Sequence, residues 1–260
     1  MTFSPRLVAL DVDGTLVDGQ NIMTAPVRDA VRALRDKGVE TVVTTGRAIP
    51  GVMSTVETLG FAAGIAIASN GAVVFSYDPP VVLHSVTFDA SAAVARILAE
   101  VPDAAVAVEE VGVGYRANKH FPDGEIGGQV TLQSVEELIA QPVTRVIIRA
   151  PEHSAEEFGA IVHSLGLTGT SYYIGYSAWV DLAPEGVSKA SGLEFVCARL
   201  GIAAAEVLAV GDGHNDYEMI QWAGRGVAMG QAPDRVKAIA DAVTGTIECD
   251  GLAQELARYL

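Results

Sequence analysis

Apolar runs of strand length alternate with stretches of helical periodicity at both ends of the chain. The expected strands are residues 7–10, 41–44, 207–210 and 227–229, and the expected helices are residues 25–37, 189–200, 217–223 and 233–240. Thr24 is placed to cap the first of these helices, and Gly38 is placed to end it. Such alternation predicts an α/β fold, in which helices cover both faces of a doubly wound, mainly parallel, Rossmann-like sheet.

The middle of the chain has a different pattern, because its expected strands follow one another in pairs. These strands are residues 81–88, 104–109, 113–117, 143–149, 171–174 and 179–182. Residues 90–100 have helical periodicity, and Ser154-Ala155-Glu156-Glu157 is a capping box that opens a helix to Leu165. We therefore expect residues 82–183 to form an α+β domain inserted into a core of residues 1–81 and 184–260.

Composition narrows the class of protein. Half of the 260 residues are hydrophobic, and 32 acidic against 17 basic residues give a formal charge of −15. A chain so acidic repels nucleic acids and anionic membrane surfaces, so neither is an expected partner. The uncharged stretch 58–77 is interrupted by Ser69-Asn70-Gly71, which predicts two strands flanking a turn instead of a membrane span. With no secretory signal pattern at Met1, we expect a cytoplasmic protein; the oligomeric state is open.

Polar clusters follow the expected strands of the core. They are Asp11-Val12-Asp13-Gly14-Thr15, Thr44-Thr45-Gly46-Arg47, Lys189 and Gly211-Asp212-Gly213-His214-Asn215-Asp216. Ligands of open α/β sheets bind at the carboxyl ends of strands, so these clusters are candidates for one site. A calcium-binding EF-hand is excluded, because positions 5, 6 and 12 counted from Asp11 hold Thr15, Leu16 and Ile22. No GxGxxG motif for a dinucleotide follows any expected strand.

The four clusters together resemble the motifs of the haloacid dehalogenase-like (HAD) phosphatases. Asp11-Val12-Asp13-Gly14-Thr15 matches the first motif, Thr45 the second, Lys189 the third, and Gly211-Asp212-x-x-Asn215-Asp216 the fourth. The long insert, Thr45-Gly46-Arg47 and Ser69-Asn70-Gly71-Ala72 are similar to the Cof-type sugar-phosphatase subgroup, which carries a large α+β cap. Of the adjacent Thr44 and Thr45, this resemblance selects Thr45.

The resemblance implies a Mg²⁺-dependent phosphomonoester hydrolase that acts on a small phosphorylated metabolite. Asp11 is then the nucleophile that forms an aspartyl-phosphate, and Asp13 is the general acid and base. Because the candidate ligands are all oxygen atoms, the implied cofactor is Mg²⁺, held by Asp11, the main-chain carbonyl of Asp13 and Asp212, with Asp216 either a ligand or a residue behind the ligands. A shared cation also explains why like charges gather there.

The remaining motif residues are expected to hold the substrate. The resemblance implies that Thr45 hydrogen-bonds a phosphoryl oxygen and that Lys189 supplies positive charge to that group and to Asp11. Gly46, Arg47, Asn70 and Asn215 are the further substrate-binding candidates.

Several activities remain open at this point. A sugar phosphate is the expected substrate class, with phosphoglycolate or another small organic phosphate as the alternative. A phosphomutase would use the same aspartyl-phosphate. A phosphoacceptor or sugar-phosphate-binding regulatory protein is the alternative from another class, although the insert of about a hundred residues favours an enzyme.

Overall fold

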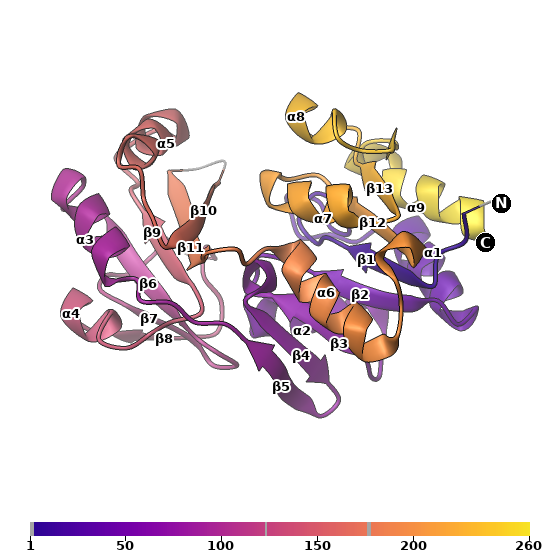
Figure 1. Cartoon of the computed structure of the whole chain (residues 1–260), viewed down its shortest axis with the longest axis horizontal. Coiled ribbons are helices and arrows are strands. Elements are labelled where there is room, and N and C mark those ends of the chain that lie inside the picture. The colour runs from indigo at the N-terminus through magenta and orange to yellow at the C-terminus, as the bar shows by residue number, and fades with distance from the viewer. Residues whose placement is uncertain (1–2, 123, 176–177) are drawn as a thin grey trace. The chain divides into compact units, whose positions relative to one another are not determined.

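The computed structural model describes residues 3–122, 124–175 and 178–260. Its contacts divide these residues into two compact units. The first unit contains the residues up to Gly46 together with Val52–Leu83 and Ser188–Leu260, and the second contains Arg47–Gly51 and His84–Val187. Figure 1 labels their helices and strands.

The first unit is built on a sheet whose strands run in the order β14-β13-β12-β1-β2-β3-β4-β5. The strands are β1 (Leu7–Leu10), β2 (Glu40–Thr44), β3 (Ile65–Ala68), β4 (Val73–Tyr77), β5 (Pro80–Ser85), β12 (Val207–Gly211), β13 (Arg225–Ala228) and β14 (Ala242–Val243). Pairing is parallel from β14 through β3, and β4 is antiparallel to β3. The predicted doubly wound, mainly parallel sheet is confirmed.

The strand order reverses direction between β1 and β12. From β1 the chain adds β2 and then β3 on one side, whereas β12 is followed by β13 and β14 on the other. The pair is in register, with Leu7 opposite Val207 and Leu10 opposite Val210. A crevice at the carboxyl ends of such a strand pair is where open α/β sheets bind ligands.

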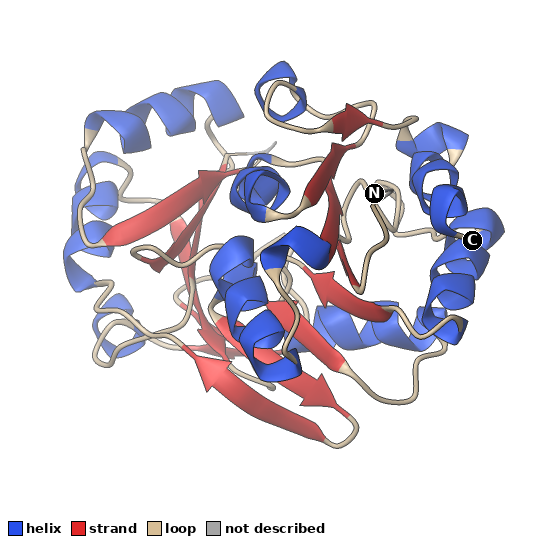
Figure 2. Cartoon of the chain, turned by 45° about the vertical axis from the view of Figure 1, so that its right-hand side comes forward, coloured by secondary structure: helices blue, strands red, loops and turns tan. Residues whose placement is uncertain are grey.

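Helices flank this sheet (Figure 2). They are α1 (Ala25–Asp36), α2 (Ile49–Leu59), α6 (Lys189–Leu200), α7 (Tyr217–Trp222), α8 (Asp234–Lys237) and α9 (Gly251–Leu256). Apolar side chains of α6 and α7, such as Leu193 and Met219, pack with Ala9 and Ala209 of the sheet in one buried cluster. As predicted, Thr24 caps α1 by accepting a hydrogen bond from the Val27 amide, and Gly38 follows its end with φ of 84°.

The second unit has a sheet of its own, in the order β10-β11-β9-β6-β7-β8. Its strands are β6 (Ala105–Glu110), β7 (Gly114–Ala117), β8 (Gln129–Leu132), β9 (Val146–Arg149), β10 (Thr170–Ile174) and β11 (Trp179–Pro184). Its helices are α3 (Ser91–Glu100), α4 (Val135–Leu138) and α5 (Ala155–Ser164). Pairing is antiparallel except between β7 and β8, and the predicted capping box at Ser154 is present. Val94, Ile97 and Phe158 of the helices share a core with Val106 and Val146 of the sheet.

Two boundaries differ in detail from the sequence analysis. The predicted domain boundary at residue 82 falls within β5, which is the edge strand of the first unit's sheet. Residues 47–51 are grouped with the second unit, where Ala48 packs among Ala107, Tyr115 and Ile147. The role of a cap, which the resemblance implies for the inserted region, stays a prediction. No helix of the described residues has the length and apolar character that a membrane span requires.

Candidate active site

Acidic side chains meet where β1 and β12 end. Asp11 directly follows β1, and its amide donates to the carbonyl of Val210, so the main chain keeps sheet geometry up to this residue. Asp212 directly follows β12, and Asp216 lies in the short helical turn behind it. One carboxylate oxygen from each of Asp11, Asp212 and Asp216 lies within 4.8 Å of the others. All three residues are buried.

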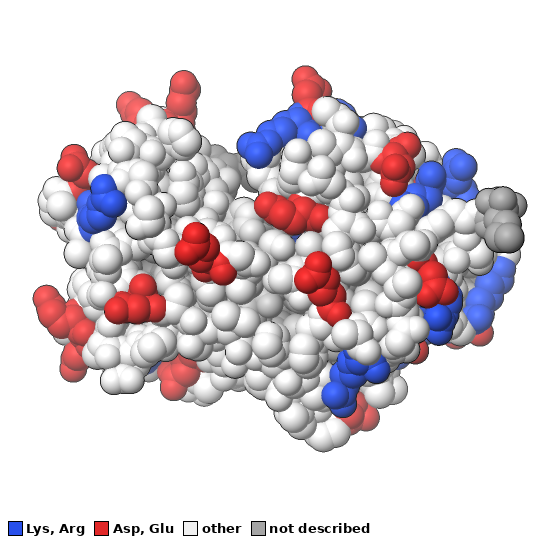
Figure 3. Space-filling model, viewed as in Figure 1, with Lys and Arg blue, Asp and Glu red and all other residues white. Residues whose placement is uncertain are grey.

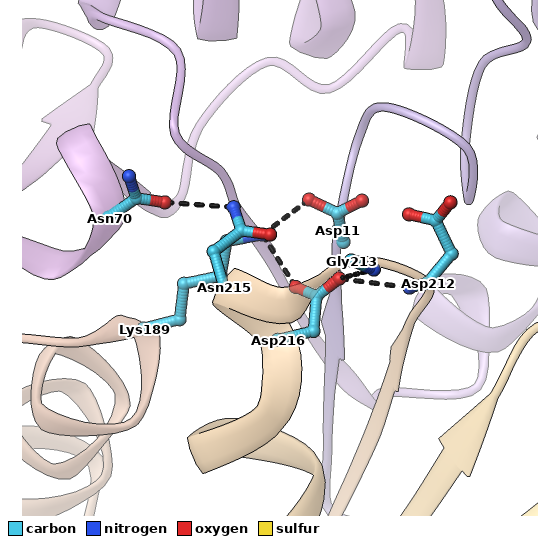
Figure 4. A network of polar contacts seen from close by, with 7 residues as sticks. All are labelled: Asp11, Asn70, Lys189, Asp212, Gly213, Asn215 and Asp216. Atoms are coloured by element: carbon cyan, nitrogen blue, oxygen red, sulfur yellow. Dashed lines mark hydrogen bonds and ion pairs between the residues drawn. The ribbon is translucent and has the colours of Figure 1, made fainter. Parts of the chain in front are cut away.

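Lys189 joins this group from the first turn of α6. Ser188 caps the helix, and Lys189 follows as its first residue. The Lys189 side chain is fully buried, and its Nζ lies 2.5 Å from Asp11 Oδ1 and 2.6 Å from Asp216 Oδ1 (Figure 4). A cation at a helix N-terminus opposes the helix dipole, so these carboxylates are what stabilises the ammonium there. Lys189 and Asp11 are 178 positions apart in the sequence, yet their side chains form a direct ion pair.

The cluster carries more negative charge than Lys189 offsets. Burial, followed by repulsion from Asp216, raises the pKa of Asp11 well above its ordinary value, although Lys189 opposes this shift. The same two causes raise the pKa of Asp212 to about 6. Burial alone would lower the pKa of Lys189, but Asp11 and Asp216 raise it, so the lysine stays charged. Such an excess of buried carboxylate favours the binding of a cation.

Asp216 has both carboxylate oxygens engaged. Oδ1 accepts from Lys189, while Oδ2 accepts from the amides of Asp212 and Gly213 at 2.9 and 2.8 Å. The carboxylate therefore holds the backbone of the loop after β12 and the lysine at the same time. A residue bound in this way fixes the positions of Asp212 and Lys189.

A turn after β3 packs against the start of α6, where Lys189 lies. Ser69 and Asn70 both have φ of 53°, a left-handed conformation that is uncommon outside glycine. Gly71 has φ of 103°, and a Cβ there would lie 1.9 Å from the Ser188 carbonyl oxygen. Glycine thus lets the turn pack against the start of α6. The Asn215 amide donates to Asn70 Oδ1 at 2.9 Å, which ties this turn to the loop after β12.

Thr45 and Gly46 lie beside the same turn. The Thr45 amide donates to the Ile67 carbonyl, and the Thr45 carbonyl accepts from the Asn70 amide, each at 3.0 Å. A Cβ at Gly46 would lie 3.0 Å from Asn70 Oδ1, so the main chain approaches Asn70 closely. Thr44 is also buried, and its hydroxyl has no hydrogen-bond partner among the residues that the structure describes. The choice of Thr45 over Thr44 stays a prediction.

Asp13 and Arg47 differ from the other predicted site residues. Asp13 is exposed, and its charge contributes to the raised pKa values of Asp11 and Asp212. The structure groups Arg47 with the second unit and not with the residues around Asp11. The contact of Arg47 with substrate stays a prediction.

Gln231 is a residue that the sequence analysis missed. Its amide donates to the Gly14 carbonyl at 2.6 Å and lies 3.4 Å from Asp212 Oδ2, so it joins the loops that follow β1 and β12. Gly14 has φ of 82°, and a Cβ there would lie 2.2 Å from Asp212 Oδ2. The signal that could have identified Gln231 is its place just after a predicted strand, residues 227–229, on the same edge of the sheet.

The sequence matches a known protein family and several characterised relatives. The family model of haloacid dehalogenase-like hydrolases matches residues 8–256. The chain is 28% identical to a 5-amino-6-(5-phospho-D-ribitylamino)uracil phosphatase of Bacillus subtilis, over 100% of this chain and 99% of that protein. It is 29% identical to a phosphoglycolate phosphatase of Natronomonas pharaonis, with 96% of each protein covered.

Solved structures agree with these sequence relatives. A haloacid dehalogenase-like hydrolase from B. subtilis superposes with a TM-score of 0.84 at 26% identity, over 98% of this chain and 100% of that one. A HAD subclass IIB sugar phosphatase superposes with a TM-score of 0.81 at 25% identity, over 97% of this chain and 98% of that one.

Proposed function

Since the chain belongs to the haloacid dehalogenase-like hydrolases and is a phosphatase, we propose that it hydrolyses the phosphate monoester of a small metabolite with the help of Mg²⁺. The observation that carries this proposal is the position of Asp11 (Figure 4). It lies at the end of β1, paired through Oδ1 with a buried lysine, in a cluster with excess negative charge.

Asp11 is the proposed nucleophile. A carboxylate oxygen of Asp11 forms a bond to phosphorus while the bond between phosphorus and the leaving oxygen breaks, which gives an aspartyl-phosphate. Water then attacks that phosphorus, the bond to the Asp11 oxygen breaks, and inorganic phosphate leaves. A covalent intermediate divides one slow hydrolysis into two easier steps. Lys189 fixes the rotamer of Asp11 and offers positive charge to the transferred group.

The residues present fit Mg²⁺. Asp11 and Asp212 supply clustered carboxylate oxygens, and we assign the main-chain carbonyl of Asp13 as a further ligand. Bound there, Mg²⁺ would neutralise charge between the nucleophile and the anionic phosphoryl group. Asp216 is assigned a positioning role behind the ligands, because Lys189 and two loop amides already engage its carboxylate.

The exposed carboxyl of Asp13 is the proposed general acid and base. It gives a proton to the leaving oxygen and later takes one from the attacking water, a role worth about 10²–10⁴-fold in rate. Thr45 and the amide of Gly46 are the proposed contacts of the phosphoryl oxygens. Asn70 and Asn215 hold that contact region in place through their mutual hydrogen bond, and Arg47 stays a candidate for the rest of the substrate.

A sugar phosphate is the proposed substrate class. Its support is the likeness to a subclass IIB sugar phosphatase along nearly the whole chain. The named relatives also include phosphatases of phosphoglycolate and of a phosphorylated ribitylaminouracil, so phosphoglycolate is the second candidate. A phosphomutase, or a phosphoacceptor or sugar-phosphate-binding protein without turnover, would keep Asp11 but would not release phosphate steadily.

The test is phosphate release from a panel of phosphomonoesters, with Mg²⁺ and with EDTA. We expect selective, Mg²⁺-dependent release by the wild-type protein and a loss of at least about 10³-fold in Asp11→Asn, which lacks an anionic nucleophile. The matched control is Asp36→Asn, at an exposed aspartate near the end of α1. Full activity of Asp11→Asn would disprove the assignment, and a single turnover without further release would favour the regulatory alternative.

A further inference from the structure

A cavity lies on the first unit, away from the acidic cluster. It has a volume of about 450 Å³ and is lined by Phe3, Arg225, Arg258 and Tyr259. Arg225 is the first residue of β13, whereas Asp11 and Asp212 follow the last residues of the parallel strands β1 and β12. The cavity therefore lies near the amino ends of the parallel strands, and the acidic cluster lies at their carboxyl ends. A strand of four residues is about 13 Å long, so the two sites are at least roughly that far apart.

The lining of the cavity carries excess positive charge. Glu255 is 4% exposed and accepts hydrogen bonds from Arg225 Nε at 2.9 Å and from the Tyr259 hydroxyl at 3.1 Å. Its other oxygen lies 3.8 Å from Arg258 Nε, which is too long for a hydrogen bond. A single carboxylate thus faces two guanidinium groups, and no acidic side chain is among the lining residues that the structure describes.

This charge is unusual for the chain, whose formal net charge is −15. At the end of the first unit where Figure 1 marks the two termini, Figure 3 shows several Lys and Arg side chains, with Asp and Glu side chains between them. The Arg258 side chain is 62% exposed, so its guanidinium is accessible from solvent. Guanidinium groups bind phosphate and carboxylate through paired N–H donors.

The aromatic side chains of the lining indicate a second property of the ligand. The rings of Phe3 and Tyr259 lie edge to face, with centroids 6.1 Å apart, and form the apolar part of the lining. Aromatic walls favour a ligand with a flat ring, through stacking or edge contacts. The volume also lies within the range of small-molecule sites, about 300–1,000 Å³.

We propose that this cavity binds a small organic anion that carries an aromatic ring, of about the size of a nucleoside monophosphate. Arg225 and Arg258 bind the anionic group, and Phe3 and Tyr259 contact the ring. This site is separate from the proposed phosphoryl site, because no residue is shared between the two.

The test is calorimetric titration with adenosine 5′-monophosphate in EDTA, which suppresses metal-dependent hydrolysis. Inorganic phosphate and adenosine are titrated separately to measure each half of the probe. We expect the wild-type protein to bind the complete probe at least tenfold more tightly than either half. Arg258→Gln should weaken its binding at least tenfold, and Phe3→Ala should remove the preference for the probe over phosphate.

The control is Arg96→Gln, which makes the same charge change on α3 of the second unit and should leave the affinity unchanged. Thermal unfolding of each variant checks that the fold is intact, and Arg258→Lys, which keeps the charge but loses the paired donors, should bind with intermediate affinity. Equal binding by wild type and Arg258→Gln, or no binding to the wild type at millimolar probe, would overturn the proposal.

Discussion

Each unit has a cluster in which one buried cation meets more than one carboxylate, since Glu109 also acts on Arg145 in the second unit. The two clusters differ in how the cation is held and in where they lie. In the second unit Arg145 Nε and Nη2 lie 2.7 and 2.6 Å from Asp181 Oδ1, and its Nη1 donates to the Tyr115 hydroxyl at 2.9 Å. In the first unit Lys189 contacts Asp11 and Asp216, and Asp212 adds further negative charge.

The Arg145 cluster is a structural ion pair, whereas the cluster around Asp11 is suited to chemistry. The Arg145 guanidinium is hydrogen-bonded on both sides, and its partners tie β11 and β7 to the start of β9. Burial raises the pKa of Tyr115 to about 12, so this partner stays neutral. The first cluster instead keeps acidic groups whose pKa values are raised, at the carboxyl ends of strands. Raised carboxyl pKa values at such a position indicate a place for a cation and a reacting group.

Lys189→Met should have the largest effect on activity. The variant leaves Asp11 and Asp216 without their shared cation, so we expect phosphate release to fall by about 10³-fold. It should also lower the free energy of unfolding by about 3–5 kcal/mol in EDTA, because buried carboxylates lose their partner. Mg²⁺ should restore part of this stability, which chemical denaturation with and without the metal would measure. A variant with normal turnover would contradict the proposed role of Lys189.

Arg145→Met is the matched substitution in the second unit. It leaves the partly buried Asp181 and the buried Glu109 without their cation, so we expect a loss of about 3–5 kcal/mol in the free energy of unfolding. Since the Arg145 cluster carries no proposed metal ligands, Mg²⁺ should not restore this loss. Calorimetric Mg²⁺ titration of the variant should give the wild-type affinity. Rescue of Arg145→Met by Mg²⁺ to the same extent as Lys189→Met would remove the distinction between the clusters.

Metal affinity should depend on pH through Asp212. Its pKa is raised to about 6 in the folded protein, so below that pH Mg²⁺ must displace a proton. Affinity should therefore fall up to about tenfold per pH unit below 6. In EDTA the folding stability depends on pH in the opposite direction. The contribution of Asp212 to the free energy of unfolding is greatest below the ordinary carboxyl pKa and is lost as pH rises through 6. Mg²⁺ titrations at pH 5, 6 and 7 measure the first effect, and a flat profile would contradict it.

Asn70→Ala should have the smallest effect. It removes the hydrogen bond from Asn215 and replaces a residue with φ of 53° by one that tolerates this conformation poorly. We expect about a tenfold loss of activity with Mg²⁺ affinity unchanged. Asn70→Gly, which relieves the backbone strain but also lacks the amide, separates the two contributions: recovery in this variant would assign the loss to strain.

The convergence of the first cluster was predictable because topology alone brings strand ends together. Asp11 and Asp212 each follow a strand whose position the apolar pattern indicated, and the sheet order places these two strand ends side by side. Lys189 begins a helix that the apolar pattern also indicated. The two oxygens of Asp216 and the amide of Gln231 were not predictable, since their contacts depend on side-chain rotamers that the apolar pattern does not contain.

Some elements were also beyond the sequence analysis. The helix Ile49–Leu59 begins with Pro50-Gly51, a pair that is typical of turns, and was not predicted. Strand β8 (Gln129–Leu132) was not predicted either, because its polar and apolar residues alternate over only four positions, and the structure shows all four exposed. Predicted residues 233–240 form a shorter helix, Asp234–Lys237, and predicted strand 227–229 begins earlier, at Arg225.

The ion pair between Asp11 and Lys189 also bears on the order in which the chain is made. The proposed nucleophile is synthesised before the second unit, but its lysine follows 178 positions later, after that unit. A nascent chain that has not reached residue 189 carries Asp11 without the lysine that it contacts in the folded protein. Contacts so distant in sequence form late, because a long loop must close first. Phosphatase chemistry should consequently be the last property that a growing chain acquires, and truncated translation products should lack it even where their N-terminal strand has folded.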